Sequence, residues 1–443
     1  MTEQDGSGGF VSPPGVLDFP CDVERLPNGN TLISDAGAEN GTGSEILEVD
    51  PRGQLVWQYA TGLRFAHSAK RLANGNTLIA DTTNDRVIEV TAAGKELFTS
   101  DAWAGGTGRL SDGSHLHYPN DAHALADGSI LITDRNNDRC VIVDRAGAVL
   151  WTYAEAVKHP HNCDLLENGN VLIADSDGNR IVEVDRAGNE VWSYQNDDEP
   201  LAWPRDADRL PNGNTQVVDS KNRRVLELTP AGKIAWQYAV PYFSNFYDAD
   251  RLPNGNVLIS DQQHHQVIEV NRQGEVVWRF RNYQPLYPTN ERLLNTSFKK
   301  VAGSGLPENW ILFSRFSEGG GKLIWTETEK GRNVPGLEFD RPGALCLHQR
   351  IAVEPGTFYT VSAKLRTEAV QSMACVQVAF LDELDGLLED VLKAPKGNLF
   401  SGTCDWSTDS FEAQAPDGAV AAEIRLFING PGKVWANNIN CFC

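Results

Sequence analysis

The sequence contains no basic stretch and no long apolar run. Lys and Arg number 39 against 60 Asp and Glu, which gives a formal net charge of −21. Nucleic-acid binding depends on neutralising phosphates, so an acidic chain without a basic stripe argues against it, and the same charge disfavours anionic membrane surfaces. No apolar run approaches the length of about eighteen residues that a membrane-spanning helix needs. We therefore expect neither nucleic acid nor membrane as a partner.

Targeting and metal-site signals are also scarce. The first residues, MTEQDG, have neither the basic region nor the apolar region of a signal peptide, which predicts a cytoplasmic protein. The eight cysteines have no zinc-like spacing, and only Cys441 and Cys443 are close in sequence. In a chain of this size we expect them to be reduced and mostly buried.

The first two thirds of the chain hold an internal repeat. Its turn, Asn-Gly-Asn or a close variant, begins at six positions: Asn28, Asn74, Asp127, Asn168, Asn212 and Asn254. Seven residues after each of these stands an aspartate: Asp35, Asp81, Asp134, Asp175, Asp219 and Asp261. An aromatic residue follows in every copy, after 24 residues in five of them and later in the first: Trp57, Phe98, Trp151, Trp192, Trp236 and Trp278.

Each repeat predicts four short strands. The Asn-Gly pair supplies the positive φ angles of a tight hairpin turn, and alternation such as that in residues 181–185 has the period of a strand. Units of about 42 to 46 residues with four strands each are typical of propeller blades. We predict an all-β chain with an N-terminal extension (1–17), a six-bladed β-propeller (18–282), a linker (283–292) and a second domain (293–443).

The repeated columns have structural explanations. The aromatic ring would fill the gap between neighbouring blades, and the aspartate would accept backbone N–H groups in the turn after the second strand. The opposite face of the propeller varies from blade to blade, and its longest connection, residues 101–118, carries Trp103, His115 and His117. A fold that repeats everything except one face is expected to use that face for recognition or chemistry.

Two columns at the start of the innermost strand give the candidate site. Six residues before the turn stand Asp22, Ser68, Asp121, Asn162, Asp206 and Asp248. One residue earlier stand Cys21, His67, Asn120, His161, Arg205 and Tyr247. Nearby are His123, Trp203 and Phe246, and we expect the connection with Trp103 and His117 to cover the mouth. Convergent polar groups with aromatic walls predict a pocket for a small-molecule substrate.

Several chemistries are open at this pocket. His67, His161 or His123 could act as base, acid or nucleophile, and Arg205 could hold an anionic group. Oxygen atoms of the ring aspartates (Asp22, Asp121, Asp206 and Asp248) could bind Ca2+, or imidazoles could bind Zn2+. The alternative is a collar in which these aspartates cap backbone N–H groups. Residues that differ within one column are the more informative ones, and they favour a specialised pocket.

The repeat resembles the arylsulfotransferase-type propeller over residues 18–280. Segments 206–214 and 248–256 both read DADRLPNGN, and outer strands end in AWQY (235–238) or VWRF (277–280). The resemblance implies nucleotide-independent transfer of sulfate between phenols through a channel histidine, a role that maps onto His67 or His161. More distantly, segment 175–180 is similar to NHL-type propellers, which include a zinc-dependent amidating lyase.

The second domain predicts an antiparallel β-sandwich. Alternation in 359–366, 376–380 and 424–428, separated by Gly, Pro and Asp turns, indicates half-buried strands. Segments 293–298, 307–310, 353–362 and 432–439 resemble a carbohydrate-binding module of the jelly-roll type. In that family Trp310, Trp406 and Trp435 would be core residues, Trp325 could stack on a sugar, and Asn437-Asn438 replaces the paired aspartates of a structural calcium site.

Two functions follow from the sequence. The first is a propeller enzyme, transferase-like or lyase-like, that acts on a small aromatic or anionic substrate at the channel mouth. The second is a scaffold that binds a ligand or glycan without catalysis, with the sandwich as the carbohydrate-binding part. Histidine, arginine and tyrosine occur at the mouth in some blades and not in others, and this difference between blades favours the enzyme.

Overall fold

The computed structural model describes residues 3–4, 10–11, 17–37, 43–154, 156–240, 244–281, 289–302, 305–315, 321–327, 333–340, 344–383, 386–389 and 393–443. It divides into two compact units, residues 12–283 and residues 1–11 with 284–443. Most of the predicted N-terminal extension and residues 283–288 of the predicted linker lie outside the described residues. No helix in the described ranges is long and apolar enough to span a bilayer.

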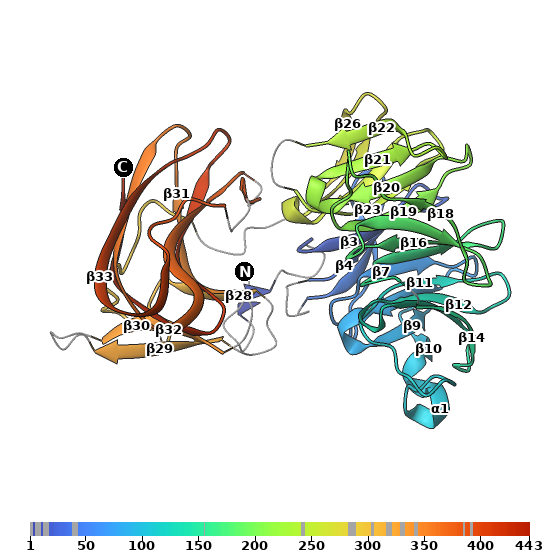
Figure 1. The fold of residues 1–443 in the computed structure, drawn as a ribbon, viewed down its shortest axis with the longest axis horizontal. Coiled ribbons are helices and arrows are strands. Elements are labelled where there is room, and N and C mark those ends of the chain that lie inside the picture. Colours follow the sequence, from blue (N-terminus) through green and yellow to red (C-terminus); the bar gives the residue numbers. More distant parts are fainter. Residues whose placement is uncertain are drawn as a thin grey trace. The chain divides into compact units, whose positions relative to one another are not determined.

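The first unit is a six-bladed β-propeller, as predicted, and each blade is a sheet of four consecutive antiparallel strands (Figure 1). Blade 1 contains β3 (Pro20–Arg25), β4 (Thr31–Asp35), β5 (Glu45–Val49) and β6 (Leu55–Tyr59). Blade 2 contains β7 (Ser68–Arg71), β8 (Thr77–Asp81), β9 (Arg86–Val90) and β10 (Glu96–Thr99). Blade 3 contains β11 (Pro119–Ala124), β12 (Ile130–Asp134), β13 (Arg139–Val143) and β14 (Val149–Tyr153). Blade 4 contains β15 (Asn162–Leu165), β16 (Val171–Asp175), β17 (Arg180–Val184) and β18 (Glu190–Tyr194). Blade 5 contains β19 (Pro204–Arg209), β20 (Thr215–Asp219), β21 (Arg224–Leu228) and β22 (Ile234–Ala239). Blade 6 contains β23 (Phe246–Arg251), β24 (Val257–Asp261), β25 (Gln266–Val270) and β26 (Val276–Phe280).

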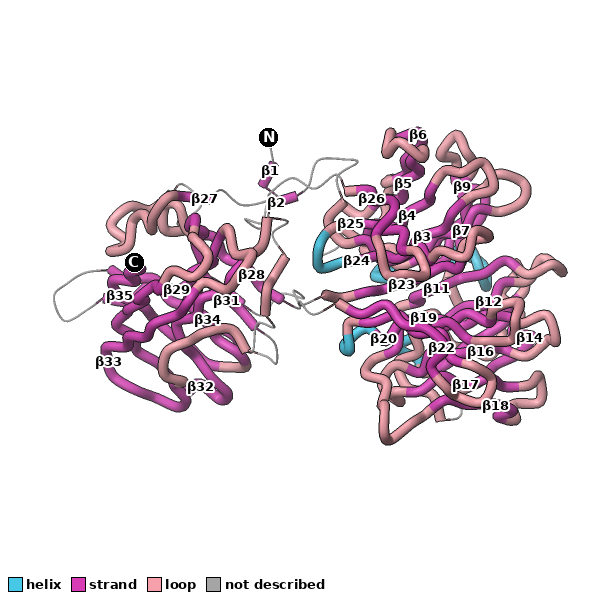
Figure 2. Tube along the Cα trace, turned by 90° about the horizontal axis from the view of Figure 1, so that it is seen from above, coloured by secondary structure: helices cyan, strands magenta, loops and turns pink. Residues whose placement is uncertain are grey.

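Helical turns in the propeller are short, and Figure 2 shows them in cyan. Four of them join the second and third strands of a blade: η1 (Thr82–Asn84), η3 (Arg135–Asn137), η4 (Ser220–Asn222) and η5 (Gln262–His264). The other two, η2 (Ser100–Ala102) and α1 (Trp103–Gly106), belong to the long connection after blade 2. The blades therefore differ mainly in their connections, while their strands repeat.

Apolar side chains of neighbouring blades form a separate buried cluster at each of the six joints. The repeated tryptophans complete these joints. Trp57, Trp151, Trp192, Trp236 and Trp278 each donate the indole N–H to a backbone carbonyl of the next blade, at 2.8–3.2 Å. This confirms the structural interpretation of the aromatic column, because the ring both fills the gap and satisfies its polar atom.

The repeated aspartates anchor the connections between blades. In five blades the carboxylate accepts a backbone N–H from the segment just before the innermost strand, at 2.7–2.8 Å: Asp35 from Asp18, Asp81 from Arg64, Asp134 from His117, Asp175 from Lys158 and Asp219 from Ala202. The sequence predicted that these N–H groups would come from the turn after the second strand. They come mainly from the preceding connection instead, which fixes the chain where it enters the channel mouth.

The second unit is all-β, as predicted, and contains one curled sheet of nine strands. The strands are β27 (Thr289–Asn290), β28 (Ile311–Arg315), β29 (Gly321–Glu327), β30 (Asn333–Phe339), β31 (Ala344–Ala352), β32 (Phe358–Leu381), β33 (Phe400–Gln414), β34 (Ala421–Asn429) and β35 (Gly432–Phe442). A short pair, β1 (Glu3–Gln4) with β2 (Phe10–Val11), belongs to the same unit. The 24-residue β32 pairs with β33, β34 and β35, so its hydrogen bonds continue through the curled part of the sheet. The jelly-roll assignment itself stays a prediction.

The core of this unit lies on one face of the sheet and includes Trp310, as predicted. Trp435 is buried but lies on the opposite face, because its neighbours Val434 and Ala436 face the core. Its ring covers Gly336, where a Cβ atom would lie 2.4 Å from the indole. Trp406 is half-buried and does not belong to the core cluster, so the predicted core role is wrong for Trp406.

Candidate functional site

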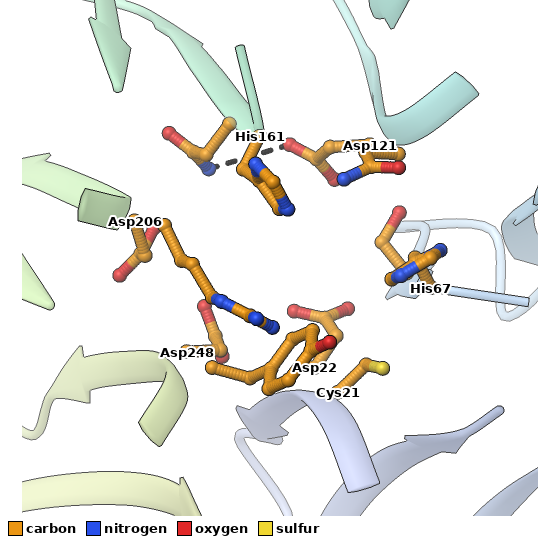
Figure 3. Close-up of a pocket in the computed structure, with 12 residues that line it drawn as sticks. Cys21, Asp22, His67, Asp121, His161, Asp206 and Asp248 are labelled. Atoms are coloured by element: carbon orange, nitrogen blue, oxygen red, sulfur yellow. Dashed lines mark hydrogen bonds between the residues drawn. The ribbon is translucent and has the colours of Figure 1, made fainter. Parts of the chain in front are cut away.

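Both predicted columns line one cavity at the start of the innermost strands. Its walls are Cys21, Asp22, His67, Ser68, Asn120, Asp121, His161, Asn162, Arg205, Asp206, Tyr247 and Asp248 (Figure 3). Because each blade contributes the same two positions, the ring follows directly from the repeat. The cavity volume is about 40 Å³, enough for roughly three water molecules. In this form the cavity therefore has room for only a small polar group, and a larger ligand must extend outward from it.

His67 lies inside an aromatic box. Its ring centroid is 4.9 Å from that of Phe65, 5.6 Å from that of Tyr118 and 6.2 Å from that of Tyr247. Burial, together with the positive charges of Arg135 and Arg205, holds the pKa of His67 well below its ordinary value. The imidazole is therefore neutral at physiological pH, and within the described structure its Nδ1 atom has no hydrogen-bond partner.

His161 has a defined hydrogen-bond arrangement. Ser176 Oγ lies 2.5 Å from the carbonyl oxygen of Pro204, to which it donates its single proton. The hydroxyls of Thr82 and Ser220 donate in the same way to the next blade. His161 Nδ1 lies 2.8 Å from Ser176 Oγ, so this nitrogen carries the proton and donates to the hydroxyl. Burial and the charges of Arg135 and Arg205 lower the pKa of His161 well below its usual value, which leaves Nε2 with a free lone pair.

Three cations lie at the mouth, each over an aromatic ring. The Arg205 guanidinium carbon is 3.4 Å from the ring centroid of Tyr247. The Arg135 guanidinium carbon is 5.4 Å from the Tyr118 centroid, and Lys221 Nζ is 3.9 Å from the Trp203 centroid. Cation–π contact holds these side chains in place. Three positively charged side chains therefore lie at the mouth of a protein whose net charge is −21.

The ring aspartates form the predicted collar. Asp22 accepts the backbone N–H of Ala69 at 2.8 Å, and Asp248 accepts that of Val23 at 2.9 Å. Asp206 accepts the backbone N–H of Ala249 at 3.3 Å. Each bond joins one blade to the next, which confirms the capping interpretation for these three residues. Within the described residues no group of three or more His, Cys, Asp or Glu side chains has the geometry to hold a metal ion, so the structure gives the Ca2+ or Zn2+ prediction no support.

Two basic residues lie deeper in the channel, at the next inward-facing position of the innermost strands. Lys70 Nζ is 2.7 Å from Asp22 Oδ1. His123 Nε2 is 2.6 Å from Asp121 Oδ2 and 3.2 Å from Asp164 Oδ1. Burial opposes the charge of His123, but these two carboxylates raise its pKa to about 9. His123 is therefore the charged member of an ion-pair cluster below the cavity, and a free base is not expected there.

The other predicted site residues lie outside the cavity. Trp203 borders it, with its ring centroid 5.7 Å from that of His161. The His117 side chain is exposed, and its backbone N–H donates to Asp134. Phe246 is fully buried at the joint of blades 5 and 6, where it packs with other apolar side chains.

Trp103 lies far from the predicted place. It is 2% exposed and donates its indole N–H to the carbonyl of Arg145 at 3.1 Å. This is the bond that the repeated tryptophans make in other blades, so Trp103 replaces the tryptophan that blade 2 lacks at Phe98. The backbone N–H of Ser111 donates to the Gly147 carbonyl at 2.9 Å, which holds this connection along the outer edge of blade 3. The prediction that the connection 101–118 covers the mouth is therefore wrong for residues 101–116.

Two features of the mouth were not predicted from the sequence. Arg135 follows the repeated aspartate of its blade. The equivalent residues of the other blades are uncharged (Ala36, Thr82, Ser176, Ser220 and Gln262), and this difference could have revealed it. The second feature is a set of positive φ angles two residues before the column that contains His67 and His161. In four blades a bulky residue has this conformation: Phe65 (53°), Tyr118 (59°), His159 (46°) and Trp203 (57°). Such backbone conformations are uncommon outside glycine and cluster at functional sites.

The chain is similar to one family model and, at low sequence identity, to several solved structures. Residues 42–252 match the family model described as outer membrane protein assembly factor BamB. No curated protein sequence matches the chain. A streptogramin B lyase structure is 13% identical, with a TM-score of 0.46 over 62% of this chain and 86% of the other. A catalytically inactive virginiamycin B lyase from Staphylococcus aureus with quinupristin is 12% identical, with a TM-score of 0.45 over 63% and 87%. The WD40 β-propeller domain of Doa1 is 15% identical, with a TM-score of 0.40 over 55% and 90%. These are likenesses of fold and concern no residue of the site.

Proposed function

We propose that the propeller is an enzyme that binds a small anionic aromatic substrate at the channel mouth, with His161 as its nucleophile or general base. The observation that carries this proposal is the state of His161. Its Nδ1 proton is held by Ser176, its ring lines the cavity, and Figure 3 shows the imidazole pointing toward the centre of the ring. A neutral imidazole with a free Nε2 lone pair is the form that a nucleophile or base requires.

The charges at the mouth favour an anionic substrate. Arg205 lines the cavity, and Arg135 and Lys221 stand at its rim over aromatic rings. A guanidinium can hold two oxygens of a sulfate, carboxylate or phosphate at once. The apolar part of the ligand would then lie against Tyr118 and Trp203, which are half-buried and have positive φ angles.

Sulfuryl transfer is the specific reaction that the repeat resemblance suggests. His161 Nε2 would attack the sulfur of an aryl sulfate, forming an N–S bond as the S–O bond to the phenol breaks. The phenolate leaves with the electron pair and takes a proton from water. Attack by the oxygen of a second phenol would then break the N–S bond, release that phenol's proton and free the imidazole. Arg205 would balance the charge on the sulfuryl oxygens, and no nucleotide takes part.

Release of 4-nitrophenolate from 4-nitrophenyl sulfate, with phenol as acceptor and no nucleotide, tests this reaction. We expect His161→Ala to lower the rate by about 10²-fold or more, the contribution typical of a catalytic base or larger. Its melting temperature should change by no more than a few degrees, because the ring contacts the cavity and loses little packing. His115→Ala, which removes an exposed histidine of the outer connection, is the matched control.

A non-catalytic binding protein is the second candidate. It is favoured by the small cavity and by the partners of His161, which are a hydroxyl and a backbone carbonyl, with no carboxylate at Nδ1 among the described residues. In that case 4-nitrophenyl sulfate would raise the melting temperature without being cleaved. A carbohydrate ligand would instead belong to the second unit, where Trp325 and Trp406 are both half-buried. Full activity of both His161→Ala and His67→Ala would exclude the proposed catalytic site.

A further inference from the structure

Two carboxyl oxygens at the cavity accept no hydrogen bond from the residues that the structure describes. Asp22 and Asp121 each use both oxygens, on backbone N–H groups and on Lys70 or His123. Asp206 and Asp248 each use only Oδ2, on a backbone N–H of the next blade. Among the described residues, Oδ1 of Asp206 and of Asp248 takes part in no hydrogen bond or ion pair. These two oxygens belong to neighbouring blades, 5 and 6, on one side of the cavity.

The channel below this side is acidic. The inward-facing residues at the next position are Glu24, Lys70, His123, Asp164, Asp208 and Asp250, so the basic residues come from blades 2 and 3. Burial and mutual repulsion raise the pKa values of Asp206, Asp208 and Asp248 well above the usual range. The same causes, partly opposed by Lys70, raise that of Asp250 to about 7. A positive charge placed between blades 5 and 6 would relieve this repulsion.

An independent observation concerns two asparagines that line the same cavity. Asn120 is 3% exposed and Asn162 is 9% exposed. Asn162 Nδ2 lies 3.4 Å from Asp121 Oδ2, which fixes the orientation of the amide and leaves its Oδ1 as an acceptor. The Oδ1 atoms of both residues are buried and accept no hydrogen bond within the described structure. Buried acceptors without a donor are costly, so they indicate a missing donor group at this cavity.

We infer that the cavity receives the protonated amino group of the ligand, which places an ammonium beside the anion held at Arg205. This inference rests on the proposed function, since it takes the anion at Arg205 as given. An ammonium has three N–H donors and suits Oδ1 of Asp206 and Asp248 together with an asparagine carbonyl. The cavity of about 40 Å³ has room for such a group. The ligand class is therefore an aromatic compound with neighbouring ammonium and anionic groups, as in an aromatic α-amino acid.

Three probes that differ by one group test the inference by titration calorimetry on the full chain. L-phenylalanine carries both charges, 3-phenylpropionate lacks the ammonium, and 2-phenylethylamine lacks the carboxylate. We expect L-phenylalanine to bind about tenfold or more tightly than either, because each lost charge removes a charge-assisted hydrogen bond. Equal or tighter binding of 3-phenylpropionate would overturn the inference but would not contradict the proposed anion site at Arg205. Failure of all three to bind would also overturn it, even if 4-nitrophenyl sulfate is cleaved.

Two asparagine variants test whether the carboxyl groups of Asp206 and Asp248 bind the ammonium. Asp206→Asn and Asp248→Asn keep an oxygen for the backbone N–H and remove the negative charge. Each should bring the preference for L-phenylalanine over 3-phenylpropionate down to about threefold or less. Asp185→Asn, in an exposed turn between β17 and β18, is the control and should leave the preference unchanged. Arg205→Gln should weaken both ligands equally. An unchanged preference in both Asp206→Asn and Asp248→Asn would overturn the assignment, whereas amino-acid binding without aryl sulfate cleavage would contradict only the reaction.

Discussion

At the scale of single residues, one column of the repeat produces two different histidines. His67 is enclosed by Phe65, Tyr118 and Tyr247, and none of the described residues forms a hydrogen bond with its Nδ1 atom. His161 has Ser176 at Nδ1, and this bond decides which nitrogen faces the cavity. A base or nucleophile needs both a neutral ring and a fixed tautomer. His161 meets both conditions, so it is the stronger candidate.

His123 gives a residue-scale prediction about pH. Its pKa in the folded protein is about 9, above the ordinary value of an unfolded histidine near 6.5. The stabilisation from its ion pairs with Asp121 and Asp164 is therefore complete below about pH 6.5 and is lost as the pH rises through about 9. We expect His123→Gln to be less stable than the unsubstituted protein at pH 6, with the difference shrinking toward pH 9.5. Urea unfolding at several pH values measures it, and a constant difference across this range would contradict the ion pairs.

At the scale of strands and connections, four of the six blade joints share one repeated assembly. Arg25, Arg71, Arg209 and Arg251 each bond a glutamate of the preceding blade at 2.7–3.0 Å. The same guanidinium groups lie over the tryptophan rings at 4.7–5.6 Å. The joint between blades 6 and 1 has this arrangement too, and all four strands of every blade are consecutive in the chain. Side chains rather than an exchanged strand therefore close the ring.

The position of Trp103 in such a joint gives an element-scale prediction. Because the side chain is buried and its ring packs against Gly147, Trp103→Ala should destabilise the propeller by about 3–4 kcal/mol. Trp103→Phe, which keeps a ring and loses the indole bond to Arg145, should cost about 1 kcal/mol. Denaturant unfolding measures both. Affinity for 4-nitrophenyl sulfate should not change in Trp103→Phe. A marked loss of affinity in this variant would instead support the predicted contact between Trp103 and the substrate.

At the scale of the whole chain, each unit has its own core. Closure of the propeller uses bonds between its own first and last blades, such as Ser260 Oγ to the Cys21 carbonyl at 2.8 Å and Arg25 to Glu269 at 3.0 Å. The main core cluster of the second unit contains only residues 293–439. Stability of either unit is therefore expected to depend mainly on its own contacts.

A fragment of residues 12–283 tests this independence. We expect it to be soluble and to unfold in one transition whose midpoint lies within a few degrees of a propeller transition in the full chain. Differential scanning calorimetry of the fragment and of the full chain gives both values. An insoluble fragment, with the full chain melting in a single transition, would show that the two units fold only together.

The sequence by itself determined the blades and the membership of the cavity. The turn at Asn28 and its five equivalents fix the strand register, and side chains on a strand alternate between two faces. Equal spacing from the turn therefore places six side chains at one level of the channel. Alternation alone places one of the two adjacent columns on the channel face. The other column lines the cavity as well, because the pairing of the first two strands has a register shift there in four blades, such as that between Pro119 and Asp121. The same logic identified the tryptophans of the joints, since one role in one blade is repeated in the others.

Only the tertiary structure decided the features that depend on contacts between distant residues. The course of residues 101–116 along the outer edge depends on Gly147 and Arg145 of the next blade, which no local pattern predicts. The charge on His123 depends on Asp121 and Asp164, and the tautomer of His161 depends on Ser176 and Pro204. Protonation responds to burial and to charges within a few ångströms, and both are set by which blades meet. The repeat therefore specified where the side chains stand, and the packed ring specified what each of them can do.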